Sequence, residues 1–261
     1  MIQFISSSDS GLKPDARSVS QLTDADSVLE SFCAECMKAP ILCPLAARAS
    51  SPGELVSKIY SMLDDAREVP ILLGESGLLT YATIKTMIIS AFYDASSFPQ
   101  LALYLDAILS RNNTAIIQYL ASLSSGPAPT DAFPDYSPAT SKENVWGIRC
   151  SDEMYRTDNL IDMLPMVEDF HAESRIIGDI TWTTAALACA QWPFEAKERP
   201  PLPFRNIETA HPMLFVSNMY DPVTSVAAGR NASASFPGSR VLINEGHGVS
   251  IDSSRLVKDR C

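Results

Sequence analysis

Apolar residues recur at helical spacing through the first half of the chain. Between residues 24 and 37 they fall three or four positions apart, the period of one helix face. Ser51-Pro52-Gly53-Glu54 combines a capping box with a proline at the first helical position, so a second helix should run to about Ala66. Three more helices are predicted over 80–93, 98–110 and 114–123. Because this all-helical block is too long for an ordinary loop, we expect a cap or lid, closed by the proline-rich stretch 126–138.

The second half mixes short apolar runs with helical segments. Helices are predicted over 159–173 and 180–189, and strand candidates are Val145–Ile148, Met213–Val216 and Val241–Ile243. The last two strands flank a segment of helical length, which makes a βαβ unit with parallel strands. We therefore expect an α/β fold, a helical cap followed by about three parallel strands with flanking helices. The expected divisions are a poorly ordered 1–21, a cap over 22–140 and an α/β part over 141–261.

Two polar side chains lie just past the predicted ends of the last two strands. Asp221 follows the strand at Met213, and His247 stands between two glycines after the strand at Val241. Open α/β sheets place their chemistry at the carboxyl ends of parallel strands. An acid that orients a histidine base makes two thirds of a nucleophilic triad, and the chain order acid then base is that of α/β-hydrolases. The alternative is that Asp221 is only a turn residue, since Asp-Pro commonly opens turns.

The same residues carry a family resemblance. HPMLFVSNMYDPVT, FPGSRVL and GHG resemble the C-terminal domain of tripeptidyl aminopeptidase-like α/β-hydrolases, which are typically secreted serine peptidases. VWGIRCSDE, CAQWP, CMKAPILCPLA and LLTYATIKTMIISAFYD resemble the cysteine motifs and cap that precede that domain, so the resemblance covers roughly residues 22–255. It implies Asp221 as the orienting acid, His247 as the base, and a peptide or small ester as the substrate.

The nucleophile motif G-x-S-x-G is absent from the sequence. Gly74-Glu75-Ser76-Gly77 is the nearest approach, but it precedes a predicted helix and Ser76 is interpreted as a loop serine. The resemblance implies that the half carrying the serine is missing, and a base without a nucleophile recovers little catalysis. Two other functions stay open: a non-catalytic remnant that binds through its cap, and a tailoring hydrolase of a small metabolite. The chain could also pair with a separate N-terminal half, or with itself as a homodimer.

The six cysteines allow more pairings than spacing can decide. The resemblance implies Cys36 with Cys43 and Cys150 with Cys189, which leaves Cys33 and Cys261 over. Both pairs would need an oxidising compartment, yet the first residues do not form a signal peptide. Asn112 and Asn231 begin triplets that fit N-glycosylation acceptors.

Composition excludes several classes of function. The net charge of −11 argues against nucleic acid and anionic membranes as partners. No apolar run approaches the length of a membrane helix, about 18 residues. His171 and His211 lack ligand spacing, so neither a metal nor another cofactor is expected.

Overall fold

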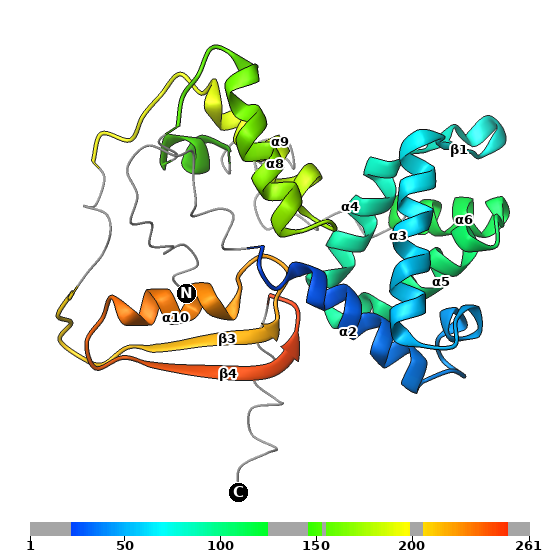
Figure 1. The fold of residues 1–261 in the computed structure, drawn as a ribbon, viewed down its shortest axis with the longest axis horizontal. Coiled ribbons are helices and arrows are strands. Elements are labelled where there is room, and N and C mark those ends of the chain that lie inside the picture. The colour runs from blue at the N-terminus through cyan, green and yellow to red at the C-terminus, as the bar shows by residue number, and fades with distance from the viewer. Residues whose placement is uncertain (1–21, 125–145, 153–154, 199–205, 250–261) are drawn as a thin grey trace, which may run out of the picture.

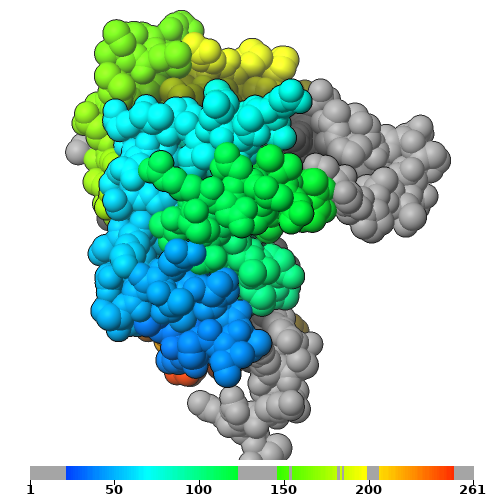
Figure 2. Space-filling view, turned by 90° about the vertical axis from the view of Figure 1, so that its right-hand side faces the viewer, coloured from blue at the N-terminus to red at the C-terminus, as the bar shows by residue number. Residues whose placement is uncertain are grey.

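The helices of the first half and the strands of the second lie on different sides of the molecule. The computed structural model describes residues 22–124, 146–152, 155–198 and 206–249. In Figure 1 the helices of the first range fill the right-hand side, while the C-terminal strands and their helix lie at the lower left. Seen from the helical side, the strands are almost hidden (Figure 2). The mixture of helices and strands is that of an α/β protein. Both expected domain boundaries, near residues 21 and 140, fall outside the described residues.

Two of the predicted helices form α2 (Ala25–Lys38) and α3 (Pro52–Glu68). A short 3₁₀ turn, η1 (Pro44–Arg48), follows the loop closed by the disulfide Cys36–Cys43, one of the two expected pairs. At the start of α3 the Ser51 hydroxyl accepts the amide of Glu54 at 3.2 Å, as the capping box predicts. The Glu54 carboxylate, however, accepts the amide of Ser50 at 2.8 Å instead of closing the box on Ser51.

The next three helices also lie within a few residues of their predicted places. They are α4 (Tyr81–Phe92), α5 (Phe98–Leu109) and α6 (Asn113–Ser124), with the 3₁₀ turn η3 (Ala95–Ser97) before α5. A hairpin that the sequence analysis did not predict joins α3 to α4: β1 (Ile71–Leu72), the turn η2 (Gly74–Ser76) and β2 (Leu78–Leu79). Strands of two residues are too short for any alternation to be read.

A buried ion pair joins α4 to the segment after α8 (Leu164–Glu173). Lys85 is fully buried, and its ammonium group forms a salt bridge with Asp179. It also donates to the hydroxyl of Tyr81 at 3.0 Å and to the carbonyl of Arg175 at 2.7 Å, so three acceptors surround its three protons. Burial lowers the pKa of Lys85, and the nearby Asp179 opposes that shift. This network is fully hydrogen-bonded and holds the two regions together.

Residues 146–152 are helical, so the strand predicted at Val145–Ile148 is wrong for its described part. An apolar run of four residues fits a buried strand and a helix turn equally well. Downstream, the predicted helices appear as η4 (Leu160–Met163) with α8, and as the π turn η5 (Gly178–Trp182) with α9 (Thr183–Ala190).

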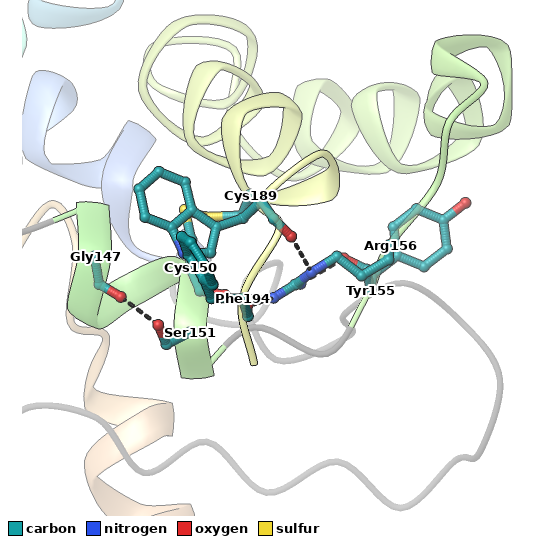
Figure 3. The surroundings of a disulfide bond; sticks show 8 residues. Gly147, Cys150, Ser151, Tyr155, Arg156, Cys189 and Phe194 are labelled. Atoms are coloured by element: carbon teal, nitrogen blue, oxygen red, sulfur yellow. Dashed lines mark hydrogen bonds between the residues drawn. A yellow bond between two sulfur atoms is a disulfide. The ribbon is translucent and has the colours of Figure 1, made fainter. Parts of the chain in front are cut away.

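The second expected disulfide, Cys150–Cys189, ties the 146–152 helix to α9 (Figure 3). Beside it, the guanidinium of Arg156 donates to the carbonyls of Cys150 at 2.6 Å, Trp192 at 2.9 Å and Phe194 at 3.0 Å. The carbonyl of Cys150 lies in the last turn of the 146–152 helix, where no helical donor remains to satisfy it, and the other two lie in the segment after α9. In the chain-entropy model a disulfide across 39 positions contributes about 4 kcal/mol.

The C-terminal unit is β3 (Leu214–Tyr220), α10 (Val226–Ala234) and β4 (Arg240–His247). The strands are parallel, as predicted, with Phe215 opposite Val241 and Ser217 opposite Ile243. In the described part of the chain this sheet has two strands, so a third parallel strand is not found there. The rings of Phe215 and Phe236 lie 5.8 Å apart on the α10 side.

Candidate active site

The carboxyl ends of β3 and β4 bring the two candidate residues to one edge of the sheet. Tyr220, the last residue of β3, pairs with His247, the last residue of β4. Asp221 follows Tyr220 directly, so Asp221 and His247 stand at the same end of two neighbouring strands. Both strands point toward α2 in Figure 1.

Asp221 is buried, with 5% of its surface exposed. Its Oδ1 accepts the amides of Val223 at 2.9 Å and Thr224 at 2.8 Å, which fixes the carboxylate in the loop before α10. Burial raises its pKa to about 6, and the charge of Asp24 acts in the same direction, against the two amides. Asp24 directly precedes α2, and its side chain reaches the start of α10, where Oδ2 accepts the amide of Val226 at 2.9 Å.

The two residues after His247 are each held by a backbone hydrogen bond. The amide of Gly248 donates to the carbonyl of Tyr220 at 3.0 Å, and the amide of Val249 donates to the carbonyl of Tyr93 at 3.1 Å. Gly248 has φ +87°, and a Cβ there would lie 2.5 Å from the Tyr93 oxygen. Position 248 therefore requires glycine for both its dihedral and its close approach to the end of α4.

The strand ends are also joined by two asparagines. Asn218 donates from Nδ2 to the carbonyl of Gly248 at 2.7 Å, and Asn244 donates to Oδ1 of Asn218 at 2.7 Å. A Cβ at Gly246 would lie 2.4 Å from Nδ2 of Asn244, so this glycine leaves room for the pair. The bonds fix the loop that carries His247 against β3.

The imidazole of His247 is enclosed by aromatic rings and contacts a serine. Tyr220 stacks on it with centroids 4.6 Å apart and planes at 15°, and Phe98 meets it edge to face at 5.3 Å. Nε2 of His247 lies 2.8 Å from the hydroxyl oxygen of Ser31, in the middle of α2. When Ser31 donates, Nε2 is the acceptor and the ring proton is on Nδ1, the tautomer that a general base requires.

Asp221 and His247 are candidates from the sequence, whereas Ser31 and Phe98 come to this site only in the structure. Asp221 and His247 each follow an apolar strand, which is a local signal. Ser31 is separated from His247 by 216 positions, and nothing around it in the sequence marks it out. The sequence places Phe98 only in a helix, where an aromatic ring is typical of core packing.

The other candidates lie elsewhere on the molecule. Ser76 is exposed in the turn of the β1–β2 hairpin. Asn112 is exposed and accepts the amide of Ala115 at 3.1 Å, while Asn231 is exposed within α10. Cys33 is a free, buried thiol whose pKa burial raises to about 12, and Cys261 is outside the described residues.

The described residues show neither a metal cluster nor a membrane helix. His, Cys, Asp and Glu side chains do not gather there in groups of three or more that could hold a metal ion. The described helices also include none with the length and hydrophobicity needed to cross a bilayer.

Comparison with known proteins relates the site to a family. Residues 175–260 match the model of an α/β-hydrolase family described as TAP-like protein. This match spans β3, α10 and β4 with both candidate residues, and the C-terminal region is therefore α/β-hydrolase-like. A comparison with curated proteins gives no significant match.

Proposed function

We propose that the α/β-hydrolase-like region makes this protein a hydrolase of acyl bonds, with His247 as the general base and Asp221 as the acid that orients it. The observation that carries the proposal is the pairing of Tyr220 with His247, which sets the acid and the base on neighbouring parallel strands at their carboxyl ends. The family match over residues 175–260 supports the same reaction class.

Each of the two groups has its own role in this proposal. His247 would take a proton from the nucleophile through Nε2 and return it to the leaving group. Asp221 would hold the imidazole in orientation and stabilise its positive charge. Because the pKa of Asp221 is about 6, the carboxylate is mostly charged above that pH and mostly neutral below it, so activity should fall as the pH drops through about 6.

The substrate class comes from the sequence resemblance. HPMLFVSNMYDPVT and FPGSRVL resemble tripeptidyl aminopeptidase-like hydrolases, which supports a peptide or a small ester as the substrate. A small metabolite ester processed by a tailoring enzyme fits the same acid and base. Peptide p-nitroanilides and short-chain p-nitrophenyl esters together cover these substrates.

The test compares turnover of both substrate types by the full chain, by His247→Ala and by His211→Ala. His211 is an exposed histidine and serves as the matched control. We expect His247→Ala to lower kcat/KM at least 100-fold, within the range of a general base, and His211→Ala to stay within twofold. Equal turnover by the wild type and His247→Ala, including no turnover by either, would refute the proposed function.

A further inference from the structure

The sequence contains no serine in a nucleophile elbow, yet the structure places a serine beside His247, the proposed general base. The hydroxyl oxygen of Ser31 lies 2.8 Å from Nε2 of His247, within the reach at which a base takes the proton of a nucleophile. Both residues are half-buried, so neither is sealed in the core. The nucleophile, the base and the acid then come from α2, β4 and the loop after β3.

Neighbouring serines on α2 are arranged differently. Ser27 lies one helical turn before Ser31 on the same face, but its hydroxyl donates to the backbone carbonyl of Asp24 at 2.6 Å. The next residue, Phe32, is buried and packs edge to face on Phe98 at 5.1 Å, and Phe98 packs on the imidazole. These contacts fix the rotation of α2 that brings Ser31 to the ring.

We infer that Ser31 is the nucleophile of this site. The inference rests on the proposed function, and it names the group to which His247 is the base. In the first step the Ser31 oxygen attacks the acyl carbon while its proton passes to Nε2 of His247. The bond to the leaving group then breaks, that group takes the proton from Nε2, and an acyl ester remains on Ser31.

Water completes the reaction. His247 removes a proton from a water molecule, the hydroxide oxygen bonds to the acyl carbon, and the ester bond to Ser31 breaks as Nε2 returns the proton to the serine oxygen. The products are the free acid and the regenerated enzyme, and no oxidant, metal or other co-reactant is consumed.

Covalent labelling locates the nucleophile directly. The full chain is incubated with an alkyl fluorophosphonate, which phosphonylates activated serines, and the adduct is located by peptide mass mapping. We expect the adduct on Ser31, its loss in Ser31→Ala and in His247→Ala, and its retention in Ser27→Ala and Ser76→Ala. An adduct on another serine, or none on the folded wild type, would overturn the inference.

Ester turnover separates the inference from the function on which it rests. Ser31→Ala should reduce p-nitrophenyl ester hydrolysis at least 100-fold, with an unchanged thermal melt that shows it still folds, while Ser27→Ala stays within twofold. Ser31→Cys should restore a burst of one nitrophenolate per chain. Turnover that depends on His247 but persists in Ser31→Ala would overturn the role of Ser31 and leave the proposed function standing. Turnover that is independent of His247 would refute both.

Discussion

Asp221 is buried, and burial opposes the charge that its proposed role requires. Its pKa rises from 3.8 to about 6, so the folded protein binds this proton more tightly than the unfolded chain does. The sign follows from linkage: the contribution to stability is complete below pH 4 and is lost as the pH rises through about 6. The loss is about 3 kcal/mol at neutral pH, since one pKa unit corresponds to about 1.4 kcal/mol.

Asp221→Asn should therefore raise the stability of the protein at neutral pH. The asparagine oxygen can still accept the amides of Val223 and Thr224, but the buried charge is gone. Urea unfolding should give nearly equal free energies for the variant and the wild type at pH 4, and an advantage of about 1–3 kcal/mol for the variant at pH 7.5. Glu75→Gln, which alters an exposed carboxylate, is the control. A variant that is less stable at pH 7.5 would show that another group pairs with the charge.

At the scale of elements, a glycine lies where the chain after β4 meets the chain after α4. Gly248→Ala combines a strained φ with a Cβ that would lie 2.5 Å from the Tyr93 carbonyl oxygen. We expect a loss of about 2 kcal/mol or more in the free energy of unfolding. Gly53→Ala is the matched control, because Gly53 lies in α3 with open space around it and alanine favours a helix. Equal stability of the two variants in chemical denaturation would contradict this account.

Elements with strong local signals were predictable, and those that depend on distant partners were not. The cap at Ser51 and the apolar spacing of α2 predicted two helices nearly to the residue. The strand predicted at Val145 is wrong because a run of four residues is too short to show a helical or a strand period. The helix found there is joined to α9 by the disulfide of Cys150. The contact of Ser31 with His247 is created by folding alone, so of the candidate site only Asp221 and His247 could be named beforehand.

At the scale of the whole molecule, the C-terminal sheet leaves apolar surface in contact with water. Its face away from α10 exposes 63% of Leu214 and 38% of Leu242. In the described part of the chain, β3 and β4 pair only with each other, so each has an outer edge of unpaired backbone groups. Parallel sheets are normally covered on both faces, and open edges are sites of strand addition.

We expect the chain to self-associate through this face at micromolar concentration. Sedimentation velocity should show species heavier than the 28.4 kDa monomer. Leu214→Lys/Leu242→Lys should restore the monomer, since a charge on the open face opposes burial. Leu103→Lys alters an equally exposed leucine on α5 and should leave the association unchanged. A wild type that sediments as a single monomer would rule out association through the open face.

The contact between Ser31 and His247 also determines when the proposed site is assembled during folding. The helices and the βαβ unit form from contacts close in sequence, whereas this contact spans 216 positions and closes only when the two regions dock. The same holds for the bond from Val249 to Tyr93. A chain with every helix and strand in place but its regions undocked therefore lacks the contact of Ser31 with His247, and we expect heating to break this contact before the secondary structure melts.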